Sequence, residues 1–242
     1  MTTFKKTKYV SMSESLALDR PSEQSKSKNN GFSIIGLGAS AGGLEALKSF
    51  FDHLPSKFKH SFVVVQHLSP DYKSLMGELL SKNTDMPIVE VKEKTKIKPA
   101  TVYLLTPKKN IFIKDGYLIL EDKPKTRTLN LPIDLFFKSL AREMTNKAVA
   151  IILSGTGSDG TSGARDIKEY GGMVMVQSPD QAEFDSMPQN AINTNLVDYI
   201  LPTEQMGEEL KRFIHHPAVY GSLEENILGD EETLIKILNF LN

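Results

Sequence analysis

Three polar side chains in this sequence stand at the ends of short apolar runs, and their types could together support nucleophilic catalysis. Ser40 follows FSIIGLGA, His67 follows SFVVVQ, and Asp159 lies in the Gly-rich stretch after AVAIIL. A histidine, whose unperturbed pKa is about 6.5, can remove the proton of a serine hydroxyl near neutral pH. A carboxylate bonded to the other imidazole nitrogen fixes the tautomer and stabilises the imidazolium. These residues therefore predict a Ser-His-Asp triad.

The stretch around Ser40, Gly38-Ala39-Ser40-Ala41-Gly42, satisfies the pattern G-x-S-x-G. Glycines on both sides of a serine permit a sharp turn from a strand into a helix and leave the hydroxyl exposed. Ser40 would then lie at a helix N-terminus, where backbone N–H groups stabilise developing negative charge. We take the N–H groups near Ala41 and around Thr156-Gly157 as candidates for the oxyanion hole.

Other interpretations of these residues stay open. The pattern Gly36-x-Gly38-x-x-Ala41 is also a Rossmann-like phosphate fingerprint, which would indicate a nucleotide-binding module. The second predicted strand ends in Gln66-His67 rather than in the acidic residue that a dinucleotide ribose prefers, which disfavours NAD. Ser40 could be a plain N-cap serine and Asp159 an ordinary turn aspartate, in a non-catalytic interaction domain that keeps the fold.

The elements that must position these residues alternate between strands and helices. Apolar runs such as SFVVV and AVAIIL do not alternate with polar residues, as expected of strands buried on both faces, and each is followed by a helical pattern. We therefore predict an α/β fold, a doubly wound, mainly parallel sheet with helices on both faces. The loops after the strands open on one side, where ligands bind. The chain order Ser, His, Asp differs from that of α/β-hydrolases, so that fold is not assigned.

Several local elements are also predicted. TVYLLTP, NIFIKDG and YLILED indicate a small antiparallel hairpin section, with turn residues at Asn110 and Asp115-Gly116. A helix is expected at about 132–146, opened by Pro132 and carrying apolar residues at helical spacing, namely Ile133, Phe136, Phe137 and Leu140. MVMVQ and DYIL are typical of strands, and EELKRFIHH and EETLIKILNFLN of helices.

Composition narrows the chemistry. The chain has 29 Lys and Arg against 30 Asp and Glu, a formal net charge of -1, which implies no nucleic-acid partner. It has no cysteine, which excludes disulfides and thiolate chemistry and fits a reducing compartment. No apolar stretch is long enough for membrane insertion, no cofactor is implied, and no His/Asp cluster has metal-ligand spacing. We expect a cytoplasmic protein in which four further histidines are solvated or capping: His53, His60, His215 and His216.

Four separated motifs, in the right order, resemble the catalytic domain of CheB-type chemotaxis methylesterases. They are GLGASAGGLEAL, VVVQHLSPDY, LPIDLFFKSLA and ILSGTGSDGTSGARDIKEYGG, followed by the segment Gln177-Ser178-Pro179 through Phe184-Asp185-Ser186-Met187-Pro188 and Ala191. The resemblance covers about residues 32–205. It implies hydrolysis of glutamyl methyl esters on methyl-accepting receptors, with glutamine deamidation as a second activity in some members. The family nucleophile falls on Ser40, the base on His67 and the acid on Asp159.

The resemblance also implies a domain plan. We expect a disordered tail over 1–30, a methylesterase catalytic domain over 31–214 and a C-terminal helical extension or connector over 215–242. Ala41 and Thr156 depart from the commoner family residues, which are a hydroxyl residue and Met. Many relatives carry a receiver domain ahead of the catalytic domain, whereas only about 30 residues precede it here. The segments GTGSDGT and FDSMPQNAI most resemble those of hybrid proteins in which a CheR-type methyltransferase domain follows in the same chain.

Overall fold

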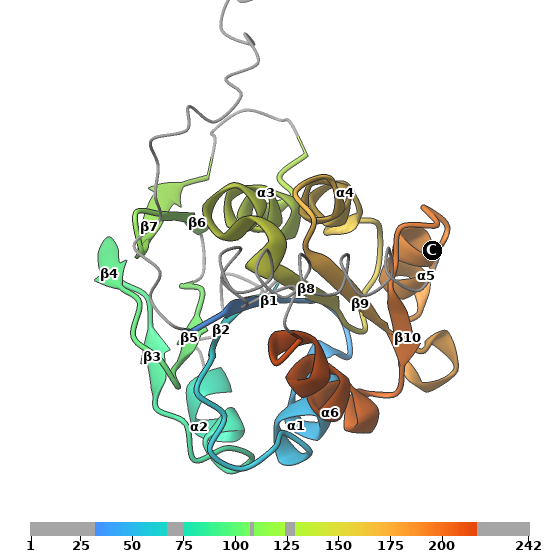
Figure 1. Ribbon diagram of the computed structural model, residues 1–242, viewed down its shortest axis with the longest axis horizontal. Coiled ribbons are helices and arrows are strands. Elements are labelled where there is room, and N and C mark those ends of the chain that lie inside the picture. Colours follow the sequence, from blue (N-terminus) through green and yellow to red (C-terminus); the bar gives the residue numbers. More distant parts are fainter. Residues whose placement is uncertain (1–31, 67–74, 107–108, 124–128, 217–242) are drawn as a thin grey trace, which may run out of the picture. The chain divides into compact units, whose positions relative to one another are not determined.

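The computed structural model of the chain describes residues 32–66, 75–106, 109–123 and 129–216 (Figure 1). The predicted N-terminal tail, most of the predicted C-terminal extension, the helix expected at EETLIKILNFLN and the proposed base His67 lie outside these residues. The domain boundaries therefore stay predictions. In the described parts of the chain, no helix is long and apolar enough to cross a membrane.

The centre of the fold is a seven-stranded sheet in the order β10-β9-β8-β1-β2-β5-β3, and all of its neighbouring strands pair in parallel. This arrangement confirms the predicted fold class. The strands span Ile34–Ala39 (β1), Ser61–Gln66 (β2), Ile88–Glu90 (β3), Val102–Leu104 (β5), Val149–Ile152 (β8), Met173–Gln177 (β9) and Tyr199–Leu201 (β10).

Helices cover both faces of the sheet, as Figure 1 shows. One face carries α3, α4 and α5, and the other carries α1, α2 and α6. Successive residues of a strand point to opposite faces, so Val63 and Val65 pack in one core while Phe62 and Val64 pack in the other. The helices span Gly43–Asp52 (α1), Met76–Leu80 (α2), Pro132–Met144 (α3), Thr161–Glu169 (α4), Ser186–Ile192 (α5) and Thr203–Ile214 (α6), with short 3-10 turns at Thr145–Lys147 (η1) and Pro179–Gln181 (η2).

Helix α3 packs unusually close to β1, because two glycines of that strand lie beneath it. A Cβ atom built on Gly36 would lie 2.8 Å from a ring carbon of Phe137, and one on Gly38 would lie 2.5 Å from Cγ2 of Ile133. Pro132 occupies the first turn of α3 as predicted, and its four predicted apolar positions are buried. The two glycines thus have a packing role inside the strand, which weakens their interpretation as a phosphate loop.

A second, three-stranded antiparallel sheet has the order β4-β7-β6, with β4 at Lys94–Lys96, β6 at Lys109–Lys114 and β7 at Tyr117–Asp122. The hairpin and its Asp115-Gly116 turn are confirmed, because both turn residues have positive φ. Two details of the prediction are wrong. The strand in TVYLLTP is β5 of the parallel sheet, since its residues are buried on both faces. Asn110 is not a turn residue but lies inside β6, where its side chain pairs with that of Asn130.

The histidines near helix ends are mostly as expected. His53 and His215 are exposed at the C-caps of α1 and α6, and each ring Nδ1 lies within 2.8 Å of a backbone carbonyl four residues earlier. His60 differs from the prediction. It is half-buried, stacks edge-on against Phe58, and its Nδ1 accepts a hydrogen bond from the Ser33 N–H at 2.8 Å.

His60 makes the stability of the fold depend on pH. Burial, helped by the charge of His215, lowers the pKa of His60 from 6.5 to about 4. Between these values the unfolded chain binds a proton that the folded chain excludes, so stability falls as the pH drops from 6.5 toward 4. The ring is partly solvated, so we expect this loss to be about 1–2 kcal/mol.

Asparagine at position 60 can still accept the Ser33 N–H through its amide oxygen, but it does not titrate. In urea unfolding, the free energy of unfolding of His60→Asn should therefore fall less between neutral and mildly acidic pH than that of the unmodified chain. His53→Asn, at an exposed site, is the matched control. Equal pH dependence in the unmodified chain and His60→Asn would contradict the role of His60.

Candidate active site

Ser40 lies on the turn that joins β1 to α1. Its N–H donates to the Ser154 carbonyl at 3.0 Å, and its carbonyl accepts the Gly43 N–H at 3.0 Å. Gly42 adopts a left-handed conformation with φ 68° as the N-cap of α1, which a side chain would oppose. The turn therefore has the strand-to-helix geometry that the G-x-S-x-G pattern predicts.

Asp159 lies between β8 and α4, and its side chain is only 2% exposed. The carboxylate accepts three backbone N–H groups, from Ile133 at 3.0 Å and from Asp134 and Gly160 at 2.9 Å each. Two of these groups belong to the first turn of α3, where free N–H groups and the helix dipole favour negative charge. The buried carboxylate is thereby held in one orientation.

Asp134 completes a reciprocal arrangement between α3 and α4. While its N–H donates to Asp159, its own carboxylate accepts the Gly163 N–H in the first turn of α4 at 2.7 Å. Burial raises the pKa of Asp134, the hydrogen bond from Gly163 opposes this, and the charge of Asp159 raises it further. Each helix start is thus capped by an acid from the other helix or its preceding loop.

The loop after β8 contacts the Ser40 turn directly. β1 and β8 are hydrogen-bonded neighbours, and a Cβ atom built on Gly155 would lie 2.9 Å from Cβ of Ser40. The same loop continues to Asp159 four residues later. The structure therefore brings Ser40 together with the loop that carries Asp159.

The three candidate oxyanion groups differ in their hydrogen bonding. The Gly157 N–H donates to Oγ of Ser186 at 3.1 Å. Among the described residues, no acceptor is paired with the N–H of Ala41 or Thr156. Within the described residues, these two N–H groups could therefore donate to a ligand oxygen without breaking a hydrogen bond. The Gly157 N–H would first have to lose its hydrogen bond to Ser186.

The base predicted at His67 follows β2, and its own position lies outside the described residues. β2 pairs with β1 in a register that places Gln66 beside Ala39. The Gln66 side-chain amide donates to the Ser40 carbonyl at 3.2 Å. The end of β2 is thus hydrogen-bonded to the Ser40 turn.

Two polar residues that the sequence did not single out tie the turn to the rest of the site. The Ser154 hydroxyl donates to the Ala41 carbonyl at 2.9 Å and accepts the Phe184 N–H at 3.0 Å. The side-chain oxygen of Gln177 accepts the Ser154 N–H at 2.8 Å. Gln177 ends β9 and Ser154 follows β8 by two residues, so each is a polar residue at the end of a buried apolar run, but their partners lie up to 113 residues away in the chain.

The segment before and within α5 supports the same loop from the other side. The Gly155 N–H donates to the Phe184 carbonyl, and the Met187 N–H donates to the Gly155 carbonyl, both at 2.9 Å. Asn190 donates its side-chain amide to the Gly157 carbonyl at 2.9 Å. These contacts give the FDSMPQNAI motif a structural role, which is to hold the loop after β8.

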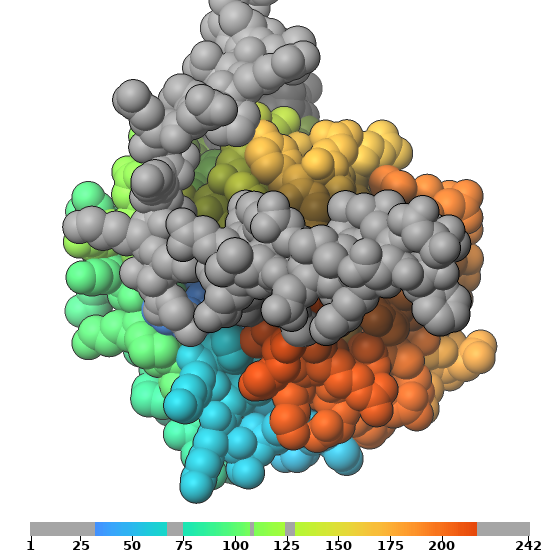
Figure 2. Space-filling model, viewed as in Figure 1, coloured from blue at the N-terminus to red at the C-terminus, as the bar shows by residue number. Residues whose placement is uncertain are grey.

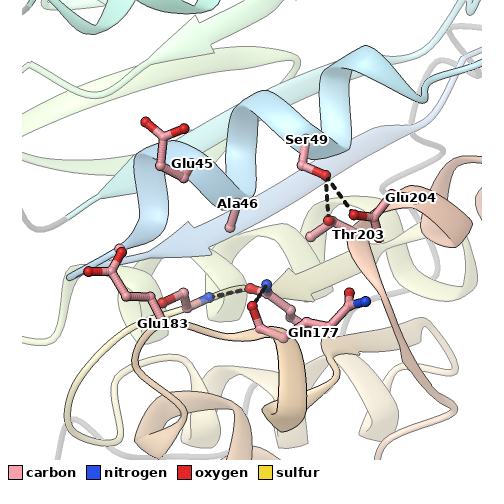
Figure 3. A pocket seen from close by; sticks show the side chains of 10 residues that line it. Glu45, Ala46, Ser49, Gln177, Glu183, Thr203 and Glu204 are labelled. Carbon is pink, nitrogen blue, oxygen red and sulfur yellow. Dashed lines mark hydrogen bonds between the residues drawn. The ribbon is translucent and has the colours of Figure 1, made fainter.

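A pocket of about 340 Å³ opens beside the Ser40 turn, between α1, α6 and the 177–183 segment (Figure 3). Its carboxylates are those of Glu45, Glu183 and Glu204, and Ser40 does not line it. The pocket therefore adjoins the turn of the proposed nucleophile Ser40 without including Ser40. Within the described residues, no three His, Asp or Glu side chains are grouped to hold a metal ion.

Close packing at Gly155 gives a testable consequence. A methyl group there would overlap Sδ of Met187 and press on Cβ of Ser40. We expect Gly155→Ala to lose about 1–3 kcal/mol of stability, as overpacked sites do, and to displace the nucleophile turn. Urea unfolding with an ester-hydrolysis assay measures both effects.

The matched control is Gly77→Ala in α2, where the nearest atoms lie 3.7 Å away, at ordinary contact distance. This variant should keep or slightly raise stability, because Ala favours helices over Gly by up to about 1 kcal/mol. A Gly155→Ala variant as stable as Gly77→Ala would show that the contact is not tight.

Comparisons with known proteins agree with this geometry. A family model described as CheB methylesterase matches residues 35–210, more than half of the chain. A Leptospira interrogans protein, provisionally named a protein-glutamate methylesterase/protein-glutamine glutaminase, is 34% identical over 186 residues, which cover 73% of this chain and 92% of that protein. An uncharacterized 104.1 kDa protein of Rhodobacter capsulatus is 41% identical over 148 residues, which cover 61% of this chain and 15% of that protein.

A solved structure shares the fold. The crystal structure of the Thermotoga maritima CheB methylesterase catalytic domain superposes with a TM-score of 0.68 at 28% sequence identity, and the match covers 74% of this chain and 97% of that one. The family match includes the Ser40 turn and the Asp159 loop. The chain belongs to the CheB methylesterase family.

Proposed function

We propose that this chain hydrolyses glutamyl methyl esters on methyl-accepting receptor proteins, with Ser40 as nucleophile, His67 as general base and Asp159 as the residue that orients His67. The observation that carries the proposal is the contact between the Ser40 turn and the loop of a buried, hydrogen-bonded Asp159, in a member of the CheB methylesterase family. Relatives of the chain carry the name protein-glutamate methylesterase.

The reaction runs in two halves. Oγ of Ser40 attacks the ester carbonyl while His67 takes its proton, and the tetrahedral intermediate collapses when His67 returns that proton to the departing methanol. A glutamyl-enzyme ester is left on Ser40. Water, deprotonated by His67, attacks this ester and releases a glutamate carboxylate and the free serine.

The negative charge on the tetrahedral oxygen needs backbone donors. The N–H groups of Ala41 and Thr156, which have no acceptor among the residues that the structure describes, flank the Ser40–Gly155 contact, and the Gly157 N–H joins them if Ser186 rotates away. Donors fixed in advance lower the barrier because they need no reorganisation during the reaction. Asp159, fixed by three N–H groups, stabilises the imidazolium form of His67.

The finer assignments follow from the family. The Leptospira and Thermotoga relatives also carry the name protein-glutamine glutaminase, so we propose glutamine deamidation as a second activity of this site. A partner CheR-type methyltransferase, in the same longer chain, is the proposed source of the methyl esters. The match to 15% of a 104.1 kDa relative supports only that such a domain can stand in a much longer chain. We also propose a cytoplasmic location for the domain.

The test is methanol release from a methylated receptor fragment by the purified chain, beside Ser40→Ala, His67→Ala and Asp159→Ala. Release that collapses in Ser40→Ala and His67→Ala, and falls in Asp159→Ala, is the expected result. No release from several fragments by the folded chain would favour the non-catalytic interaction domain. Calorimetry with NAD, NADP and ATP tests the nucleotide-binding alternative, for which we expect no heat of binding.

A further inference from the structure

The small antiparallel sheet has two unlike faces, because paired residues of neighbouring strands share a face. Ile119 of β7 pairs with Lys94 of β4 and Phe112 of β6, and Tyr117 pairs with Lys96 and Lys114. These six residues therefore share one face, called the outer face below. Leu118 of β7 pairs with Thr95 and Ile113 on the opposite face.

Only the opposite face packs into the protein. Ile111, Ile113 and Leu118 are buried in the core cluster that contains α3, and Leu120 packs against it. Phe112, Tyr117 and Ile119 belong to neither described core cluster and are only partly buried. The outer face thus presents two aromatic rings and a branched aliphatic side chain to the surroundings. In Figure 2, the green atoms at the left edge come from this part of the chain.

Lysines outnumber acids on the outer face, where Glu121 of β7, two residues after Ile119, is the acidic residue. Lys94, Lys96 and Lys114 are exposed, and in the described parts of the chain none of them is paired with a carboxylate. Nζ of Lys94 lies 4.5 Å from the centre of the Tyr117 ring, a cation–π contact. By contrast, Lys109 at the start of β6 is neutralised by Asp122 at 2.6 Å. An apolar patch framed by three lysines and one glutamate has a positive balance of charge, which is complementary to an acidic, partly apolar partner.

The distance from the outer face to the proposed active site can be bounded by following the chain from Lys114 to Asp159. β6 rises about 3.4 Å per residue, so Lys114 lies about 14 Å from Asn110. The Asn110 side chain pairs with that of Asn130, and Ile133, three residues later, donates its N–H to Asp159. Three extended residues add at most about 11 Å. The two stretches span at most about 25 Å before the Asn110–Asn130 and Ile133–Asp159 contacts are added, so a helix of about 30 residues, about 45 Å long, would reach from the outer face to Asp159.

We propose that the outer face binds a glutamate-rich segment of the substrate protein. This inference rests on the proposed function, because a protein with several glutamate methylation sites carries free carboxylates beside its esters. Lys94, Lys96 and Lys114 pair with those carboxylates, and Phe112, Tyr117 and Ile119 contact apolar side chains of the same segment. The outer face sets affinity for the protein substrate and takes no part in the chemical step.

The primary test is binding of fluorescein-labelled poly-L-glutamate to the full chain, followed by fluorescence anisotropy at low salt. The test variant is Lys94→Glu/Lys96→Glu/Lys114→Glu. The control, Lys59→Glu/Lys82→Glu/Lys138→Glu, makes the same charge change at exposed lysines of other elements. We expect the test variant to bind about tenfold more weakly and the control to change about twofold or less. Equal weakening in both variants, or no weakening in either, would overturn the proposal.

A second assay links the outer face to catalysis. A copolymer of glutamate and glutamate γ-methyl ester, and an uncharged peptide with one glutamyl methyl ester, serve as substrates. The test variant should raise KM for the copolymer with kcat unchanged, and should leave the uncharged peptide unaffected. If the unmodified chain releases methanol from neither substrate, the proposed function fails, while the anisotropy result still decides whether the outer face binds polyglutamate.

Discussion

Replacing Ser40 by Ala is expected to lower methanol release by about 10⁴-fold or more, because no other group can form the covalent glutamyl-enzyme. The fold should be retained, since the substitution leaves unchanged the backbone N–H and carbonyl of Ser40, which bind Ser154 and Gly43. Circular dichroism and urea unfolding verify the fold, and release of methanol from a methylated receptor fragment measures activity.

Ser154→Ala is the matched control for this variant. Ser154 is a second serine beside the same turn, but it is 1% exposed and its hydroxyl is held by Ala41 and Phe184. Losing this buried hydrogen bond should shift the turn and lower activity by about tenfold. A folded Ser40→Ala variant with activity similar to that of Ser154→Ala would contradict the nucleophile assignment.

Replacing Asp159 by Asn is expected to have the second-largest effect, a loss of about 10³–10⁴ in kcat. The asparagine loses the negative charge that stabilises imidazolium and can hold the histidine in the wrong tautomer. Stability should also fall by about 1–3 kcal/mol, because the amide NH₂ group would meet N–H donors at the start of α3 or α4. Kinetics and urea unfolding separate the two effects.

The control for Asp159→Asn is Asp134→Asn. This variant removes a neighbouring carboxylate but keeps an oxygen to accept the Gly163 N–H. Its kcat should change far less than that of Asp159→Asn, because Asp134 acts on the helix starts and has no contact with substrate in the proposed mechanism. Equal losses of kcat in the two variants would mean that Asp159 contributes only to packing of α3 against α4.

Much of the fold could be predicted because the apolar runs are short and unbroken. SFVVVQ and MVMVQ are buried on both faces, and only a parallel sheet covered by helices on both sides buries such strands. Asp115-Gly116 also indicated its turn correctly, because both residues tolerate positive φ. The local sequence was therefore sufficient to predict those strands and turns whose conformation depends on their own residues.

The predictions were wrong where contacts with residues far away in the sequence determine the local structure. Asn110 has a typical turn residue type, yet its pairing with Asn130 keeps it in a strand. Val102–Leu104 stands next to the hairpin in sequence but pairs with β2 and β3. A histidine in a loop is expected to be solvated, but His60 accepts a hydrogen bond from the N–H of Ser33, 27 residues away. Propensity carries no information about such contacts.

In the candidate site, too, local geometry could be predicted from the sequence and long-range contacts could not. The Ser40 turn could be predicted from glycine spacing, because the backbone geometry is local. The capping of α3 by Asp159, 25 and 26 residues away, could not, and neither could the hydrogen bonds that join Ser154 to Ala41 and Gln177. These contacts depend on the order in which β1, β8 and β9 lie side by side, which is known only once the sheet is formed.

The measurement that tests the central claim most directly is covalent labelling with a fluorophosphonate, followed by peptide mapping in a mass spectrometer. An activated serine reacts with this probe, whereas an unactivated serine does not. The proposed mechanism predicts a single adduct on the peptide that contains Ser40, lost in Ser40→Ala and strongly reduced in His67→Ala. An unlabelled, folded chain, or an adduct on a different serine such as Ser154, would contradict the assignment of Ser40 as the nucleophile.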